Sequence, residues 1–182
     1  MSETFFIGDT HFGHKNIIRF EPELRPFTTI EEHNAELVRR WNSVVGVKDT
    51  VYHLGDFCFG KANLAIGHQL NGDKRLIMGN HDHYPSADYL TIFTKILGAM
   101  EYDRMICTHL PIHPSAFPRY TMNIHGHTHG KQVMRFVDDC RVEPDMRYFN
   151  VSCEQIDCTP IPFSVIKKAY WDNQFVMGEG SV

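Results

Sequence analysis

Short apolar runs followed by a glycine and then a polar residue recur through the first half of the chain. The runs, each with the polar residue that comes after its glycine, are Phe5-Phe6-Ile7 with Asp9, Thr50-Val51-Tyr52-His53-Leu54 with Asp56, and Arg75-Leu76-Ile77-Met78 with Asn80. A short apolar run bounded by a turn residue is typical of a buried strand. The pattern therefore predicts three strands that each end directly before a polar side chain.

The second half repeats this arrangement with histidine as the polar residue. One apolar run leads into His109, and another leads into His125-Gly126-His127-Thr128-His129. The predicted elements of this half are strands at 105–108, 121–124 and 148–152 and a closing helix at 163–171. Strands mixed with helices predict an α/β protein, in which sites form at the carboxyl ends of the strands.

The longest helix is predicted to begin after Thr29, a residue type that caps helices, and to end at Gly46. The apolar residues expected on its inner face are Ile30, Leu37, Val38, Trp41, Val44 and Val45. A shorter helix is expected within 62–70. His33 and His68 lie on these helices and are expected to face solvent, whereas His53 is expected to be a core or edge residue of its strand.

Composition places the chain among ordinary globular proteins. Its 182 residues suit one domain spanning 1–182, and 42% of them are apolar. A net charge of −4 gives no bulk attraction to nucleic acid or to anionic membranes. The sequence contains no apolar run of ~18 residues and no secretory leader, so we expect a cytoplasmic protein without a membrane span. Its five dispersed cysteines are expected to be free thiols.

Carboxylates, an amide and imidazoles fall at the predicted strand ends, and these are all metal-ligand types. The seven candidate ligands are Asp9, His11, Asp56, Asn80, His109, His127 and His129. A nitrogen and oxygen set without cysteine suits manganese, iron or zinc. Seven ligands give two metal ions four protein ligands each only if one carboxylate is shared. Two such ions ~3.5–4 Å apart form a known device for phosphoryl hydrolysis.

These motifs resemble those of the calcineurin-like metallophosphoesterase superfamily. The matching segments, in the family's order, are Gly8-Asp9-Thr10-His11, Gly55-Asp56, Gly79-Asn80-His81-Asp82, His109 and Gly126-His127-Thr128-His129. The resemblance covers residues 8–129 and implies an α/β sandwich of two mixed β-sheets flanked by helices. The segments Asp9–Ile18 and Asp49–Phe57 also resemble a compact group found in bacteria and phages, which implies the cytoplasm of such a cell.

The resemblance implies a role for each motif residue. Asp9, His11, Asp56 and His129 would bind the first ion; Asp56 would bridge to the second ion, which Asn80, His109 and His127 would complete. His81 would act on the substrate as the catalytic group, by stabilising the transition state or protonating the leaving oxygen. Asp82 would orient His81. His14, His113 and Arg119 are further candidates for substrate binding.

The function expected from these features is hydrolysis of a phosphodiester or phosphomonoester, with a small substrate such as a cyclic nucleotide. In-line attack by a metal-bridging hydroxide, assisted by His81, is the expected mechanism. Two alternatives stay open. A phosphoprotein phosphatase is disfavoured because no arginine adjoins Asp56 or Asn80. A non-catalytic scaffold of the same fold is disfavoured because His81 is present. The sequence does not determine the native metal, the cellular substrate or the oligomeric state.

Overall fold

The first sheet contains five strands in the order β11-β1-β2-β3-β4. In the computed structural model, which describes the backbone of residues 2–178 and the side chains of residues 2–172, these strands are β1 (Thr4–Ile7), β2 (Thr50–His53), β3 (Asp73–Ile77), β4 (Lys95–Leu97) and β11 (Ile161–Pro162). β1 to β4 run parallel, and β11 is antiparallel to β1. The three strands predicted in this half are confirmed, and β4 and β11 were not predicted.

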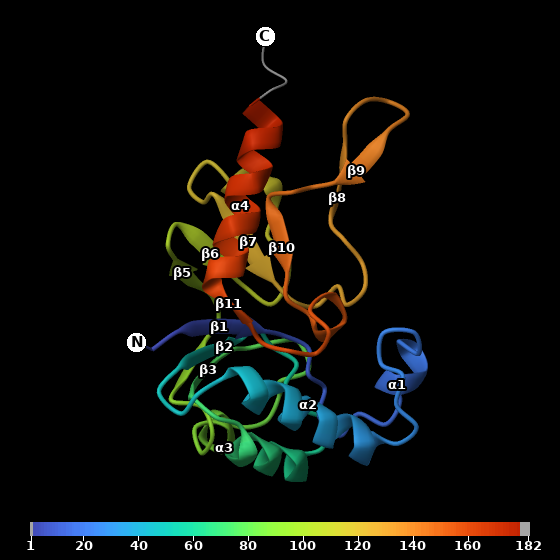
Figure 1. Cartoon of the computed structure of the whole chain (residues 1–182), viewed down its shortest axis with the longest axis vertical. Helices are drawn as coiled ribbons and strands as arrows, with labels where there is room; N and C mark the ends of the chain where they lie inside the picture. Colours follow the sequence, from blue (N-terminus) through green and yellow to red (C-terminus); the bar gives the residue numbers. More distant parts are fainter. Residues whose placement is uncertain (1, 179–182) are drawn as a thin grey trace.

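The second sheet is also mixed and has the order β10-β7-β6-β5. Its strands are β5 (Met100–Tyr102), β6 (Met105–Cys107), β7 (Met122–His125) and β10 (Tyr148–Asn150). β5 pairs antiparallel with β6, and the other neighbours are parallel. A separate hairpin of β8 (Met134–Phe136) and β9 (Val142–Pro144) projects from this half of the molecule (Figure 1).

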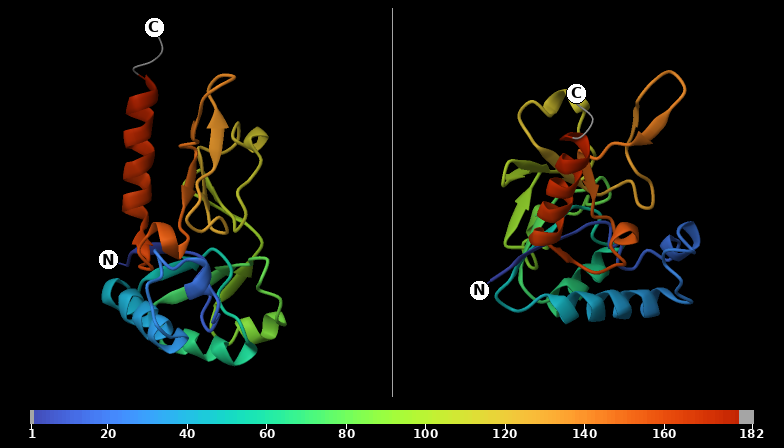
Figure 2. Two further views of the ribbon diagram at one scale, coloured as in Figure 1. Left: turned by 90° about the vertical axis from the view of Figure 1, so that its right-hand side faces the viewer. Right: turned by 45° about the horizontal axis from the view of Figure 1, so that its top comes forward.

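Helices flank the two sheets. Between residues 2 and 178, the α-helices are α1 (Ile17–Phe20), α2 (Ile30–Val44), α3 (Ser86–Tyr89) and α4 (Phe163–Gly178), and the 3-10 helices are η1 (Lys61–Gln69), η2 (Pro114–Ala116) and η3 (Cys153–Gln155). α2 lies along the first sheet, and α4 stands beside the second sheet (Figures 1 and 2). The expected fold class, two mixed sheets flanked by helices, is therefore confirmed. Within residues 2–178, none of the helices has the length and apolar character needed to cross a bilayer.

Alternating side chains of the first sheet contribute to two apolar cores. Phe5 and Val51 face the core beneath α2, together with Leu37 and Trp41 of that helix. Phe6 faces the opposite core, which lies between the two sheets and is closed by α4; other members of this core are Ile77, Cys107, Ile124, Val151 and Ile166. This alternation follows from the period of two in a strand. All five cysteines are free, as expected.

Helix α2 begins as predicted, and its inner face differs from the expected one at two positions, Val44 and His33. The Thr29 side chain accepts a hydrogen bond from the Glu32 backbone N–H at 3.1 Å. Val44 is 40% exposed, so its expected place in the core was wrong. His33 was expected to face solvent and is instead fully buried. It is three residues after Ile30 and four before Leu37, which places it on the buried side of the helix. His68 is exposed and His53 is buried, as expected.

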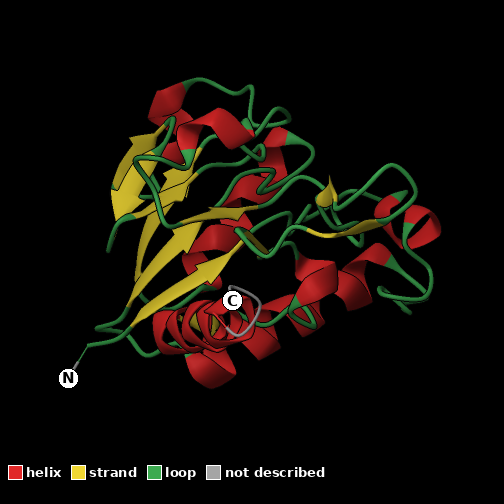
Figure 3. Cartoon of the chain, turned by 90° about the horizontal axis from the view of Figure 1, so that it is seen from above, coloured by secondary structure: helices red, strands yellow, loops and turns green. Residues whose placement is uncertain are grey.

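The two sheets meet at the carboxyl ends of their strands. Gly8, directly after β1, forms a parallel bridge with Ser152, which follows β10. Backbone hydrogen bonds join Gly8 to Val151 and to Cys153 at 2.8 and 3.1 Å. Seen from above, the larger strands lie at the left of the molecule, and many of the loops lie at the right (Figure 3). The loops that carry the candidate ligands from both sheets are therefore brought together.

Candidate metal centre

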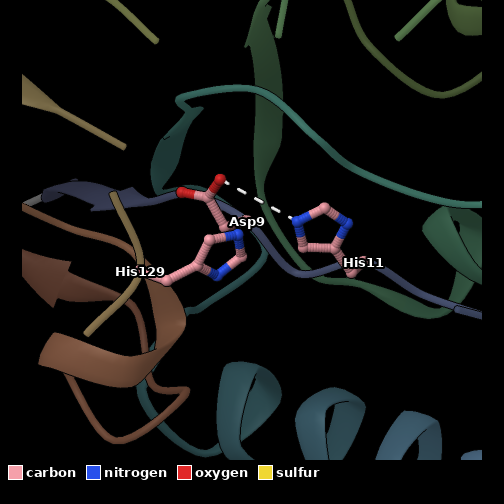
Figure 4. A group of neighbouring side chains, drawn as sticks. All are labelled: Asp9, His11 and His129. Carbon is pink, nitrogen blue, oxygen red and sulfur yellow. Dashed lines mark ion pairs between the residues drawn. The ribbon is translucent and has the colours of Figure 1, made fainter. Parts of the chain in front are cut away.

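Three residues from the two sheets form the first group of potential ligands. Asp9 and His11 lie in the loop after β1, and His129 lies in the loop after β7. One ligand atom from each residue falls within 4.8 Å of the others, and the three side chains point toward one another (Figure 4). The carboxylate of Asp9 lies 4.0 Å from His11 Nε2. This group contains three of the four residues expected to hold the first metal ion.

The second group consists of Asp56, His109 and His127, whose ligand atoms also fall within 4.8 Å of one another. His109 Nε2 lies 3.5 Å from Asp56 Oδ2 and 2.8 Å from Asn80 Oδ1. The structure therefore places all four residues expected at the second metal ion in one cluster.

Asp56 connects the two groups. Its Oδ2 atom lies 3.8 Å from His11 Nε2 in the first group and 3.5 Å from His109 Nε2 in the second. The other oxygen, Oδ1, accepts a hydrogen bond from the His81 backbone N–H at 2.8 Å. One carboxylate thus faces ligands of both groups, which is the position that a shared ligand requires.

Buried polar atoms of the first group lack hydrogen-bond partners. Asp9 Oδ1 and both ring nitrogens of His11 are buried and unpartnered. In the second group, Nδ1 of His109 lies 2.8 Å from the Leu54 carbonyl and must donate to it, and Nε2 lies 2.8 Å from Asn80 Oδ1. Unpaired buried acceptors are costly, and a cation that accepts these lone pairs removes the cost. The residues therefore fit divalent metal ions.

Most candidate ligands have an unusual backbone conformation. Asp9, His11, Asp56, His127 and His129 all have positive φ, between 49° and 69°. L-residues rarely adopt this left-handed region, and such strain tends to cluster at functional sites. Five of the seven candidate ligands thus share a backbone conformation that local sequence preferences disfavour.

Two glycines allow the backbone to approach the carboxylates closely. A Cβ atom on Gly126 would lie 2.5 Å from Asp9 Oδ2, and one on Gly79 would lie 2.2 Å from Asp56 Oδ1. Neither position has room for a side chain. These contacts explain why glycine precedes His127 and Asn80 in the motifs.

Burial and neighbouring charges set the protonation of the first group. Burial raises the pKa of Asp9 to about 6, although nearby imidazoles oppose the shift. Burial lowers the pKa of His11 well below its ordinary value. Burial is the largest single influence on His129 and lowers its pKa, but the hydrogen bond to Glu154 and the charges of Glu154 and Asp9 together raise the pKa overall. In the chain without metal, the site therefore contains neutral and incompletely charged groups.

His81 lies beside the ligands and is exposed. Its ring centroid is 5.9 Å from that of His11 and 5.0 Å from that of Phe59. Asp82 has different partners from the ones we expected. Its carboxylate accepts hydrogen bonds from the backbone N–H groups of Asp56, Phe57 and Gly79, at 2.7 to 3.0 Å. In the described part of the chain it makes no hydrogen bond to His81, so Asp82 fixes the ligand loops instead of orienting that ring.

The three expected substrate-binding residues lie in different surroundings. The His14 ring is 5.6 Å from His11 and 4.0 Å from Phe59, so it lies next to the first group. His113 is exposed and contacts Ser115 at 2.9 Å. Arg119 is also exposed, with its guanidinium 5.5 Å from the Tyr120 ring. The structure brings His14 to the site, and among residues 2–172 we find no contact that joins His113 or Arg119 to it.

Sequence reasoning missed Glu154, Arg25 and Phe59. Glu154 hydrogen bonds to His129 at 3.0 Å and also belongs to a potential ligand group with His129 and Glu21. It comes after strand β10, but without the glycine that precedes Asp9, Asp56 and Asn80, so it carries only part of the motif signal. Arg25 and Phe59 lie outside the motifs, and no pattern in the sequence marks them.

The fold and the two clusters define an α/β protein with a paired histidine and carboxylate centre. No family model matches the chain. It is 33% identical over 179 residues to the uncharacterized protein MJ1445 of Methanocaldococcus jannaschii, covering 92% of this chain and 91% of that protein. The chain belongs to the same family as MJ1445.

Two further proteins are similar to this chain. Gene 66 protein of Mycobacterium phage L5 is 45% identical over 89 residues, which are 45% of this chain and 41% of the phage protein. The crystal structure of AQ665 from Aquifex aeolicus, a protein of unknown function, superposes with a TM-score of 0.69 and 29% identity. That match covers 92% of this chain and 99% of AQ665. The same architecture is therefore found in a bacterial protein of similar extent.

Proposed function

We propose that this chain is a calcineurin-like metallophosphoesterase that hydrolyses a small phosphoester, such as a nucleotide phosphodiester, at a two-metal centre. The observation that carries the proposal is the pair of adjacent ligand groups, with the Asp56 carboxylate 3.8 Å from His11 of one group and 3.5 Å from His109 of the other. Paired sites with shared carboxylates are used for phosphoryl hydrolysis.

We propose that the seven candidate ligands are divided between two ions. Asp9, His11 and His129 would hold the first ion, and Asn80, His109 and His127 would hold the second, with Asp56 shared. When bound, two such ions activate water at neutral pH and neutralise charge on the phosphoryl oxygens. Manganese, iron and zinc all suit this donor set.

The protein's own contribution to the reaction is positioning and proton transfer. His81 is exposed next to the buried ligands, where its ring is free to meet a substrate. We assign to His81 the transfer of a proton to the leaving oxygen, which is work suited to imidazole near neutral pH. The peptide bond before His81 is held by the Asp56 carboxylate, so ligand and catalytic group are mechanically linked.

A small diester is favoured over a phosphoprotein as the substrate. No arginine adjoins Asp56 or Asn80 in the sequence. Arg25 enters this region but is fully buried, and its guanidinium bonds only inward among the described residues. An open groove beside Asn80 and His109 is lined by Leu110, Pro111 and Ile112, and it leaves room for an uncharged substituent of the phosphoester.

The direct test is hydrolysis of bis-p-nitrophenyl phosphate and of a 2′,3′-cyclic nucleotide by the metal-free chain before and after addition of Mn²⁺. We expect turnover only with metal, and its loss on chelation. A phosphopeptide assayed at equal enzyme separates the phosphatase alternative, since faster release from the peptide would support that alternative. If the chain binds two ions per molecule and cleaves none of these substrates, the proposal is wrong and the scaffold alternative gains support.

A further inference from the structure

Arg25 is a buried arginine that joins three separate segments behind the metal centre. Its side chain has no exposed surface. Nε donates a hydrogen bond to Glu154 at 2.7 Å, and Nη1 donates to the Thr10 carbonyl at 3.1 Å and to His33 at 2.9 Å. Nη2 donates to the carbonyl of Asp9. Every nitrogen of the guanidinium is therefore in use, and none is directed to solvent.

Two of these bonds hold the loop that carries Asp9 and His11. Both ligands have left-handed backbone conformations, with φ of 55° and 49°. A strained loop persists only when its surroundings hold it in place. Arg25 bonds the carbonyl groups of Asp9 and Thr10, the two peptide units between the ligands. Its planar fork suits such simultaneous bonds.

Glu154 extends this arrangement to the third ligand of the first group. Its Oε1 accepts hydrogen bonds from Arg25 and from His129 Nδ1, at 2.7 and 3.0 Å. A carboxylate accepts but does not donate, so the proton of His129 lies on Nδ1. The lone pair of Nε2 is then free for a metal ion. Carboxylates that fix a histidine tautomer in this way also make it a better ligand.

A second chain of contacts supports the same loop from helix α2. His33 accepts from Arg25, so the hydrogen on its other nitrogen is directed to Asn34 Oδ1 at 3.2 Å. That oxygen also accepts from the Gly13 backbone N–H at 3.1 Å. The loop from Asp9 to Gly13 is thereby held at both ends by groups that begin at Arg25.

We infer that Arg25 and Glu154 are positioning residues for the first metal ion, which set the ligand loop and the His129 tautomer before the ion binds. The inference rests on the two-metal site of the proposed function. Neither residue needs to touch the ion or the substrate. A purely structural ion pair would instead stabilise the metal-free chain and leave the affinity of the folded chain for metal unchanged.

The test measures Mn²⁺ binding to the full-length, metal-free chain by calorimetry, at a temperature where circular dichroism shows every variant to be folded. Glu154→Gln keeps the side-chain shape and one oxygen acceptor but removes the negative charge. Arg25→Lys keeps the positive charge but removes the planar guanidinium and its several N–H donors. We expect each of these two variants to weaken the Mn²⁺ affinity of one of the two binding steps by about 10- to 100-fold. The affinity of the other step should change by no more than a few-fold. Glu143→Gln is the matched control, since Glu143 forms an ion pair with Arg135 in the projecting β8–β9 hairpin.

Nitrogen NMR of the histidine rings supplies a readout that is independent of activity. At a pH where the His129 ring is neutral, metal-free wild type should show its proton on Nδ1, and Glu154→Leu should lose that preference. If Glu154→Leu does not fold, the calorimetry of Glu154→Gln and Arg25→Lys decides the question. Two unchanged Mn²⁺ affinities in these variants would overturn the inference and leave the proposed function standing. Failure of wild type to bind Mn²⁺ would overturn both.

Discussion

The two ends of the candidate site differ in exposure and in support. At the enclosed end, Asp9 is 0% and His11 is 3% exposed, and Arg25 and Glu154 pack behind them. At the open end, Asn80 and His81 are both exposed. We infer that the enclosed end serves metal binding, because its side chains are buried and held in place. The open end serves substrate binding, because its side chains are accessible.

The comparison also explains why the enclosed end holds unsatisfied atoms. Asp9 Oδ1 and the His11 nitrogens are buried without partners, whereas the exposed imidazole of His81 is accessible to water. A site that is to hold an ion without water competing must leave its lone pairs free. Changes at the shared ligand, at the open end and at the enclosed end should therefore produce different losses, and we give these from the largest effect to the smallest.

Asp56→Ala should have the largest effect, because this carboxylate faces both ligand groups. We expect loss of both metal ions and a fall in phosphodiester turnover of about 10³-fold or more, since a metal clamp is worth several kcal/mol. Elemental analysis and Mn²⁺-dependent turnover measure the two losses. Asp103→Ala, which removes a surface partner of Lys167, is the control. If only one ion is lost, Asp56 is not shared.

His81→Ala should reduce turnover without changing the metal content, which distinguishes the role of the open end from metal binding. Turnover should fall by about 10²- to 10⁴-fold, the usual range for loss of a general acid, while two ions stay bound. The fall should be smaller for a p-nitrophenolate leaving group than for an alkoxide, because the former needs no proton. The exposed His68→Ala is the matched control. Equal losses with both leaving groups would remove proton donation from the role of His81.

The ligand loops were predictable because their signal is local. Apolar runs marked the strands, glycines marked the close approaches, and polar residues such as Asp9, Asp56 and Asn80 followed directly. The carboxyl ends of parallel strands lie at the same edge of a sheet, so residues that follow these strands come close together. The short strands β4, β5 and β11 were missed because they have two or three residues and no motif residue follows them, whereas the equally short β6 leads into His109.

The support of the enclosed end was not predictable in the same way. Arg25 and Glu154 are separated by 129 positions, and only the meeting of the two sheets at Gly8 brings them together. Their pairing is a property of the tertiary structure. The burial of His33 differs, since its spacing from Ile30 and Leu37 already placed it on the inner stripe of α2. His33 was expected to face solvent because histidine is polar, although its helical spacing indicated a buried position.

The smallest predicted effect concerns acid sensitivity at the enclosed end. Burial, reinforced by Arg25, lowers the pKa of His33 to about 4. Because the ordinary value is 6.5, the unfolded chain binds this proton first, and stability is lost as pH falls from 6.5 toward 4. Urea unfolding of the metal-free chain should show wild type losing up to about 3 kcal/mol more than His33→Gln across that range. The exposed His68→Gln should follow wild type, and parallel curves for wild type and His33→Gln would show that His33 is not held neutral by its surroundings.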